Sequence, residues 1–157
     1  MIKGVADVEL IAYSSEHQKI FKELNLEWLD HFNLTESHDL MVLDDPQKTI
    51  LDQGGFIFLA MCDGQIVGSA ALIKEDEGVY ELAKMAVTKQ FRGRGISKIM
   101  IEQCLLKAVE LKAHKVSLFS NHQLTTAISL YEKYGFKHVE VQNSPFATAD
   151  VKMELIF

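Results

Sequence analysis

The chain has 157 residues, of which 48% are hydrophobic and 24% are charged, which excludes a disordered or collagen-like chain. A chain of this length is expected to fold as a single domain over residues 1–157, and it can bury about 70% of its unfolded surface without a metal or disulfide. Sixteen basic and 22 acidic residues give a net charge of −6, which argues against nucleic-acid binding because that needs clustered Lys and Arg.

Cysteine usage and the lengths of the hydrophobic runs predict a cytoplasmic protein that does not enter a membrane. Only Cys62 and Cys104 are present, far apart and within apolar runs, so we expect buried free thiols rather than a disulfide or a zinc site. No apolar run approaches the roughly 20 residues that span a bilayer. The first ten residues contain Asp7 and Glu9 and are not typical of a secretory signal.

Hydrophobic periodicity and turn residues predict eleven or so elements along the chain. In order, they are a strand over Val5 to Tyr13, a helix from Ser15 to about His31, a loop or short helix over Asn33 to Asp45, a short helix from Pro46 to Leu51, strands over Phe56 to Cys62, Ile66 to Ile73 and Val79 to Thr88, a long helix over Gly95 to Ala113, a strand over Val116 to Ser120, a helix from about Thr125 to Tyr134, and strands over Phe136 to Gln142 and Asp150 to Phe157.

Local signals support several of these boundaries. Ser15 and Gln18 have the spacing of a capping box at a helix start. Asp63-Gly64 between two apolar runs is the strongest short hairpin signal in the chain. Gly135 is expected as a left-handed residue at a helix end. The order of elements predicts an α/β fold built on a sheet with mixed strand directions.

The run Gln90-Phe91-Arg92-Gly93-Arg94-Gly95 lies between a predicted strand and the long helix. A Gly-rich turn at a helix N-terminus presents free backbone N–H groups and positive charge, which suits a pyrophosphate. Lys98 stands where the dinucleotide fingerprint requires a third Gly, and the Gly-Lys-Ser/Thr of a Walker loop is absent. Taken alone, the run is equally compatible with a tight turn carrying solvated Arg side chains.

A second motif accompanies this loop. The stretch Tyr80-Glu81-Leu82-Ala83-Lys84-Met85-Ala86-Val87 leads into it, and Ala127-Ile128-Ser129-Leu130-Tyr131-Glu132-Lys133-Tyr134-Gly135-Phe136 follows about 35 residues later. In order, spacing and placement these motifs resemble those of the GNAT superfamily of acetyl-CoA-dependent N-acetyltransferases, over about residues 5–157.

The resemblance implies a GNAT fold, with a mixed sheet of six or seven strands flanked by about four helices and two splayed central strands that admit the pantetheine arm of acetyl-CoA. It implies that the pyrophosphate is held by backbone N–H groups of six consecutive residues, and that the thioester arm pairs with a strand segment. The residues that it assigns to the loop are Arg92, Gly93, Arg94, Gly95, Ile96 and Ser97, and those that it assigns to the strand are Met85, Ala86 and Val87. No metal is expected.

Two positions depart from the family pattern. Ser97 stands where many members have Gly, although its hydroxyl can still donate to phosphate. Leu124 stands where many members have Asn three residues before the Ala of the second motif. Asn121 lies three residues earlier and is a candidate for that cofactor contact.

The resemblance also assigns the chemistry of acetyl transfer. The amine must lose a proton, the thioester carbonyl must be polarised, and the departing thiolate is best protonated. Glu81 matches a general-base Glu of some members, the Met85 N–H would polarise the carbonyl, and Tyr131 matches the general-acid Tyr. The alternatives are a solvated carboxylate at Glu81 and a core aromatic at Tyr131.

The acceptor is expected to be a primary amine on a small molecule, an amino acid or a peptide. Glu36, His38 and Asp39 are candidates for recognising a cationic amine, the alternative being a solvated loop, and Trp28 and Phe32 could wall the acceptor pocket or close the core. A non-catalytic acyl-CoA-binding sensor is the alternative function, and a nucleotide-binding protein is a third. The last strand could supply the edge of a homodimer.

Overall fold

One seven-stranded sheet, with strand order β1-β2-β3-β4-β5-β7-β6, runs through the computed structural model, which describes residues 7–142 and 144–157. β4 and β5 are parallel, and every other neighbouring pair is antiparallel. The strands are β1 (Val8–Ala12), β2 (Phe56–Cys62), β3 (Gln65–Asp76), β4 (Val79–Val87), β5 (Lys115–Ser120), β6 (Lys137–Val139) and β7 (Val151–Ile156). The predicted α/β sheet of mixed direction is therefore confirmed.

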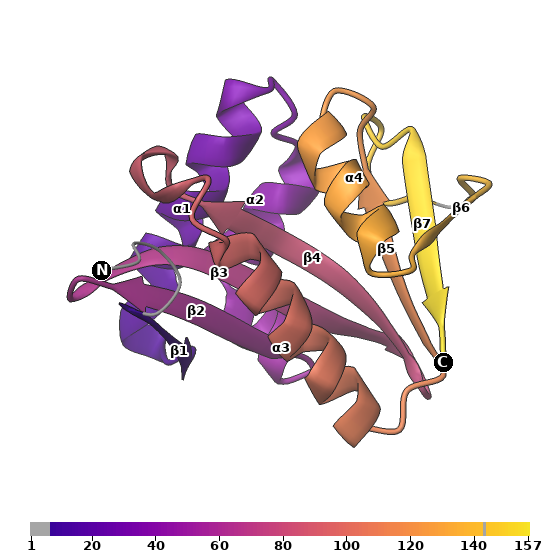
Figure 1. Ribbon diagram of the computed structural model, residues 1–157, viewed down its shortest axis with the longest axis horizontal. Coiled ribbons are helices and arrows are strands. Elements are labelled where there is room, and N and C mark those ends of the chain that lie inside the picture. Colours follow the sequence, from indigo (N-terminus) through magenta and orange to yellow (C-terminus); the bar gives the residue numbers. More distant parts are fainter. Residues whose placement is uncertain (1–6, 143) are drawn as a thin grey trace.

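Four α-helices cover the two faces of the sheet among the described residues (Figure 1). On one face lie α3 (Ile96–Glu110) and α4 (Thr125–Lys133), and on the other lie α1 (Gln18–His31) and α2 (Ser37–Asp44). Short 3-10 helices at Ser15–His17 and Lys89–Phe91 and a π-helical turn at Gln47–Leu51 complete the connections.

Each face of the sheet has its own hydrophobic core. Beneath α3 and α4, fully buried Met100 and Cys104 pack with strand residues such as Leu72. Beneath α1 and α2, Phe21 and Leu43 pack with others such as Leu59. β2 and β3 need apolar residues on both faces because helices cover both sides, which explains why their sequences read as continuous apolar runs.

Two turns form as their residues predict. Asp63 and Gly64 both have positive φ, +53° and +76°, as a two-residue turn between twisted strands requires. Gly135 follows α4 with a φ of +94°, which confirms the left-handed helix end. The two thiols, Cys62 and Cys104, are free and buried, as expected.

Several boundaries differ from the prediction, three of them by their caps or strand ends. The helix cap is Ser14 rather than Ser15, because the imidazole of His17 accepts the Ser14 N–H at 3.0 Å and so takes the role expected of Gln18. The strand predicted from Phe136 ends at Val139, and the first strand spans Val8–Ala12, its predicted residues 5 and 6 lying outside the described residues. In the part of the chain that the structure describes, no helix is both long and apolar enough to cross a membrane.

Candidate active site

The central strands β4 and β5 separate partway along their length. They pair only where Val79–Glu81 faces Lys115–Ser117, although β4 continues to Val87 and β5 to Ser120. In Figure 1 the two strands converge near the C-terminus and diverge towards the N-terminal end of α4. The predicted splay is present, and it opens a cavity of about 710 Å³, a size typical of ligand pockets.

The Gly-rich loop forms one end of this cavity. Gly93 and Gly95 have φ values of +78° and +79°, and Gly95 is the N-cap of α3. A Cβ on Gly93 would meet no atom within 4 Å, so it is the backbone conformation rather than crowding that favours glycine there. The first N–H groups of a helix have no partner within it, and Ile96 and Ser97, the first two residues of α3, line this end of the cavity.

The guanidinium groups of the loop are already bound within the protein. Arg92 donates from Nε to the Val87 carbonyl at 2.8 Å and from Nη2 to Glu27 at 3.2 Å, and its guanidinium lies 4.9 Å from the Trp28 ring centroid. The Arg92 N–H is bonded to the Lys89 carbonyl at 3.4 Å. Arg92 therefore fixes the loop to α1, and its own backbone N–H group already has a partner within the protein.

β4 contains a bulge at its centre. Its register with β3 skips Lys84 and Met85, and Lys84 has a φ of +51°. The Lys84 carbonyl accepts a hydrogen bond from Ser69 Oγ at 2.7 Å, and Asn25 Nδ2 donates to the same hydroxyl at 3.0 Å. A bulge leaves an extra residue outside the ladder and redirects the backbone, here at the middle of the cavity wall.

The bulge also changes which side chains share a face. Residues three apart in a regular strand point to opposite faces, yet Glu81 and Lys84 both face α2. Met85 faces the opposite side, where it packs with the core beneath α3 and α4. The centre of the cavity is therefore lined by ionisable groups on one side and by Met85 and Tyr131 on the other.

Tyr131 of α4 is buried against Met85. Its hydroxyl lies 3.7 Å from Met85 Sδ, and its ring contacts Phe136 edge-on. Burial raises the pKa of Tyr131 to about 12, so the phenol remains protonated and able to donate a proton. Tyr134 differs, because its hydroxyl donates to Glu102 of α3 at 2.6 Å, away from the cavity.

Glu81 lines this cavity and also a second one of about 320 Å³ beneath α2. Burial, followed by the charge of Glu75, raises the pKa of Glu81 to about 7, against an opposing influence of Lys84 and Lys152. Glu75 is itself held by Ser117 Oγ at 3.2 Å. A carboxyl group with this pKa can both take up and release a proton near neutral pH.

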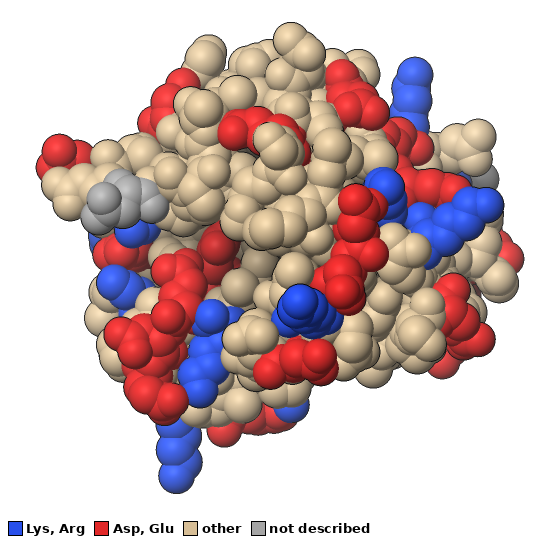
Figure 2. Space-filling model, turned by 180° about the vertical axis from the view of Figure 1, so that it is seen from behind, with Lys and Arg blue, Asp and Glu red and all other residues tan. Residues whose placement is uncertain are grey.

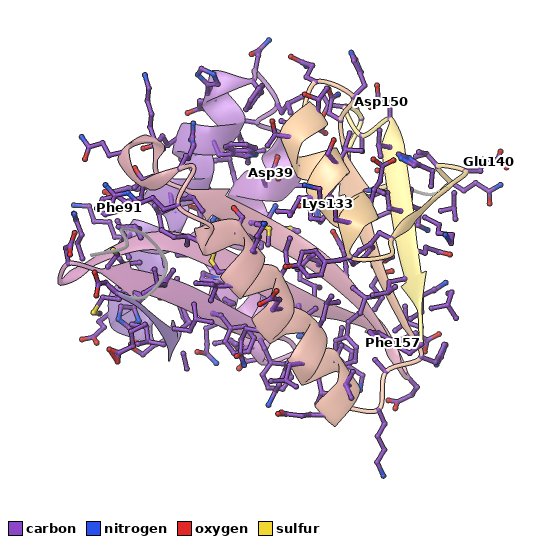
Figure 3. The ribbon with its side chains drawn as sticks, viewed as in Figure 1. Asp39, Phe91, Lys133, Glu140, Asp150 and Phe157 are labelled. Carbon is purple, nitrogen blue, oxygen red and sulfur yellow. The ribbon has the colours of Figure 1, made fainter. Side chains whose placement is uncertain are left out.

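α2 brings a buried ion pair to the same wall. Lys84 Nζ lies 2.7 Å from Asp39 Oδ1, and the two side chains are only 6% and 4% exposed. Asp39, labelled in Figure 3, projects from α2 towards β4, and its other oxygen accepts the Glu36 N–H at 2.9 Å. The Lys84 ammonium also lies 5.1 Å from the centre of the Phe146 ring.

The carboxylate of Glu36, the N-cap residue of α2, holds part of the segment between β6 and β7, called here the strap (residues 144–149). Glu36 accepts the N–H groups of Ala147 and Thr148, both at 2.9 Å, and the Thr148 hydroxyl. Burial alone would raise the pKa of Glu36, but these hydrogen bonds hold the pKa below its usual value. Glu36 thereby holds the strap beside the cavity, whose lining includes Phe146 and Thr148.

The other residues that the sequence singled out differ in how they relate to the cavity. Asn121 lines the cavity, but its Nδ2 donates to the Thr148 carbonyl at 2.7 Å and its Oδ1 accepts the Gln123 N–H at 3.0 Å. His38 packs on the Phe146 ring at 4.9 Å between centroids. Trp28 and Leu124 line the cavity directly.

The structure thus brings most of the predicted residues to one cavity, together with residues that the sequence did not single out. The cavity lining includes the predicted Glu81, Met85, Ala86, Val87, Arg92, Gly93, Gly95, Ile96, Ser97, Asn121 and Tyr131. Arg94 instead packs its guanidinium 4.6 Å from the Phe91 ring. Lys84 faces α2 because of the bulge, and Glu36 holds the strap that carries Phe146 and Thr148, so no local pattern indicated these three residues.

Comparison with known proteins agrees with this geometry. A family model described as an acetyltransferase (GNAT) domain matches residues 53–138. An uncharacterized N-acetyltransferase of Bacillus subtilis, YvbK, is 28% identical over 123 residues, which are 76% of each chain. Human N-acetylaspartate synthetase is 36% identical over 97 residues, which are 61% of this chain but only 32% of the human protein.

Solved structures show the same fold. A GNAT-family acetyltransferase of Staphylococcus aureus superposes with a TM-score of 0.87 at 21% identity, covering 95% of this chain and 98% of the other. The PaiA N-acetyltransferase of Thermoplasma acidophilum, solved in complex with coenzyme A, gives 0.77 at 16% identity, covering 96% and 99%. A spermidine N-acetyltransferase of Vibrio cholerae, in complex with CoA and spermine, gives 0.73 at 18% identity, covering 97% and 96%.

Proposed function

We propose, from the premise that this chain belongs to the GNAT family of acetyltransferases and is an N-acetyltransferase, that it transfers the acetyl group of acetyl-CoA to a primary amine by direct attack in a ternary complex. The observation that carries the proposal is the cavity at the splay. It joins an anion-binding helix end, a β-bulge, a protonated phenol and a carboxyl group of near-neutral pKa.

The residues present fit acetyl-CoA, which supplies the activated acetyl group. The backbone N–H groups at the start of α3 are the donors for its pyrophosphate, and Ser97 adds a hydroxyl. The segment Met85–Val87, which is not paired with β5, offers its backbone to the extended pantetheine arm. Asn121 supports this site through the strap, since both ends of its amide are bound within the protein.

Three groups of the chain would then act on the reaction. Glu81, directly or through water, takes a proton from the acceptor ammonium, which frees the nitrogen lone pair for attack on the carbonyl carbon. The Met85 N–H stabilises negative charge on the carbonyl oxygen. As the carbon–nitrogen bond forms and the carbon–sulfur bond breaks, Tyr131 donates its proton to the departing thiolate.

The amine acceptor is supported by the relatives as well as by the chemistry. Two of the similar proteins are named N-acetylaspartate synthetase and spermidine N-acetyltransferase, and both names imply acetylation at nitrogen. They differ in charge, one compound carrying carboxylates and the other only amines, so they do not agree on an acceptor for this chain.

The test is release of CoA thiol from acetyl-CoA in the presence of a panel of amines, amino acids and short peptides, with mass spectrometry of the acetylated product. We expect turnover with at least one primary amine and none with its N-methylated tertiary analogue. Tight binding of acetyl-CoA without turnover of any acceptor would contradict the enzyme proposal and support the acyl-CoA sensor. Calorimetry with acetyl-CoA, CoA and ATP measures that binding independently.

A further inference from the structure

Three ionisable side chains alternate in sign along one wall of the cavity. Glu81 and Lys84 come from β4, where the bulge turns both towards α2, and Asp39 comes from α2. The charge of Lys84 lowers the pKa of Glu81 and that of Asp39 raises it, so the three groups lie within electrostatic reach of one another. The wall therefore presents negative, positive and negative groups rather than one sign.

Lys84 retains hydrogen-bonding capacity towards the cavity. An ammonium has three N–H donors, and among residues 7–142 and 144–157 Asp39 is its hydrogen-bond acceptor, at 2.7 Å. The other neighbour of the ammonium is the Phe146 ring, which attracts the charge but accepts no ordinary hydrogen bond. Lys84 is among the residues that line the cavity, so a ligand bound there can accept hydrogen bonds from the remaining donors.

The charge balance of this wall disfavours a polyamine. Lys84 offsets the charge of Asp39, and the Glu36 carboxylate is already occupied by three donors of the strap. A polycation needs several uncompensated carboxylates, whereas a ligand with one ammonium and one carboxylate matches a wall of alternating sign. Outside the cavity, acidic and basic side chains are interspersed over the α1 and α2 face (Figure 2), so no broad acidic field is visible there either.

We propose that the acceptor is a free amino acid, whose ammonium is directed at Glu81 and whose carboxylate accepts hydrogen bonds from Lys84. This inference rests on the proposed acetyl transfer and names its substrate class. Lys84 is adjacent to Met85 in the bulge, so a carboxylate held at Lys84 keeps the neighbouring amine close to the thioester position. Phe146 and the strap cover the charges from water, which strengthens their interaction with the ligand.

The experiment compares amino acids with the amines that decarboxylation leaves: histidine with histamine, lysine with cadaverine, and leucine with isopentylamine, with spermidine and a dipeptide beside them. We expect one amino acid to exceed its decarboxylated partner in kcat/KM by about 10- to 100-fold, the usual range for losing a hydrogen bond to a charged group. Equal or better turnover of the decarboxylated amine, spermidine or the dipeptide would overturn the inference, while acetyl transfer itself would stand.

Variants of the ion pair test the role of Lys84. K84M alone would leave Asp39 buried and unpaired, so the double variant K84M/D39N removes both charges while preserving shape. We expect it to bind acetyl-CoA normally but to lose the preference for the amino acid over its decarboxylated partner. D39N alone keeps an amide oxygen that can accept from the Lys84 ammonium, so it should retain that preference. A preference that survives in the double variant would exclude Lys84 as the carboxylate site, and absence of turnover of every amine by the wild type would instead contradict the proposed function.

Discussion

The pKa of Glu81 depends strongly on where the fold places this residue. A glutamate on an exposed strand ionises near pH 4.5, but here burial and the nearby Glu75 raise its pKa to about 7. Lys84 and Lys152 prevent a larger rise, which would leave the carboxyl group protonated and useless as a base. The carboxylate and the carboxylic acid forms of Glu81 are therefore both populated near neutral pH.

This balance predicts the acid limb of the pH–rate profile. Because the base must be deprotonated, kcat/KM should rise as the pH increases through about 7, and E81Q should lower kcat/KM near pH 7 by about 100-fold. E75Q is the matched control. It removes a negative neighbour that raises the Glu81 pKa. The acid limb of the E75Q pH–rate profile should therefore move to lower pH, with no loss of maximal rate. An E81Q profile identical to that of the wild type would exclude Glu81 as the base.

We expect removal of the Tyr131 hydroxyl to affect only the chemical step. Y131F removes the buried hydroxyl near Met85, so kcat should fall by about 10- to 100-fold while acetyl-CoA affinity, measured by calorimetry, is unchanged. Y134F serves as the control, because that hydroxyl bonds Glu102 outside the cavity. Equal kcat values for the two variants would reduce Tyr131 to a packing residue.

Among the elements that form the site, the junction between β4 and α3 depends most on residues that are consecutive in the sequence. Its glycines, its position before a helix and its proposed anion-binding role all follow from a few consecutive residues. The labelled Phe91 in Figure 3 marks the start of this loop, and its buried ring anchors the turn beneath the Arg94 guanidinium. The shape of the loop therefore depends on this packing as well as on its glycines.

A carboxylate in this loop should abolish cofactor binding. G95D places negative charge and a side chain at the N-cap of α3, where phosphate is expected, so acetyl-CoA affinity should fall by at least 100-fold. G64D adds the same group at a similar positive φ in the hairpin between β2 and β3 and should bind normally. Calorimetry, with circular dichroism to confirm folding, measures both. Normal binding by G95D would remove the loop from the cofactor site.

The sequence predicted what depends on neighbours in the chain. The hairpin at Asp63-Gly64, the helix end at Gly135 and the element order were correct, because turn chemistry and periodicity are local. The cap at Ser14 was missed because a histidine replaced the usual acceptor. The contacts of Glu36 with the strap bridge more than 110 residues, and a pattern in one sequence contains no information about such pairs.

The β-bulge in β4 could not be predicted from the sequence. The strand Val79–Val87 was predicted almost to the residue, yet regular alternation would place Glu81 and Lys84 on opposite faces. The irregularity depends on hydrogen bonds from Ser69 and Asn25, which lie on other elements. Lys84 therefore became a candidate for acceptor recognition only when the tertiary structure was in view.

For the whole molecule, the important feature is that the sheet consists of two parts joined by a short seam. β1 to β4 form one part and β5 to β7 the other, and the ladder between β4 and β5 that joins them has three residue pairs. α3 packs on the first part, whereas α2 reaches the second through Glu36 and the strap. Ligand bound between the parts contacts both and should stabilise their arrangement.

The seam has a consequence for solubility. Beyond Glu81 and Ser117, the facing sides of β4 and β5 are free strand edges inside a sheet, and such edges are templates for association with other chains. The proposed pantetheine arm would cap the β4 edge, so CoA should slow heat-induced aggregation more than adenosine 3′,5′-bisphosphate does at equal occupancy, since the nucleotide lacks the arm. Light scattering at a fixed temperature measures this, and equal protection by the two ligands would mean that the edge is not what aggregates. The opening that admits a cosubstrate would then also be the place where the empty enzyme is most vulnerable.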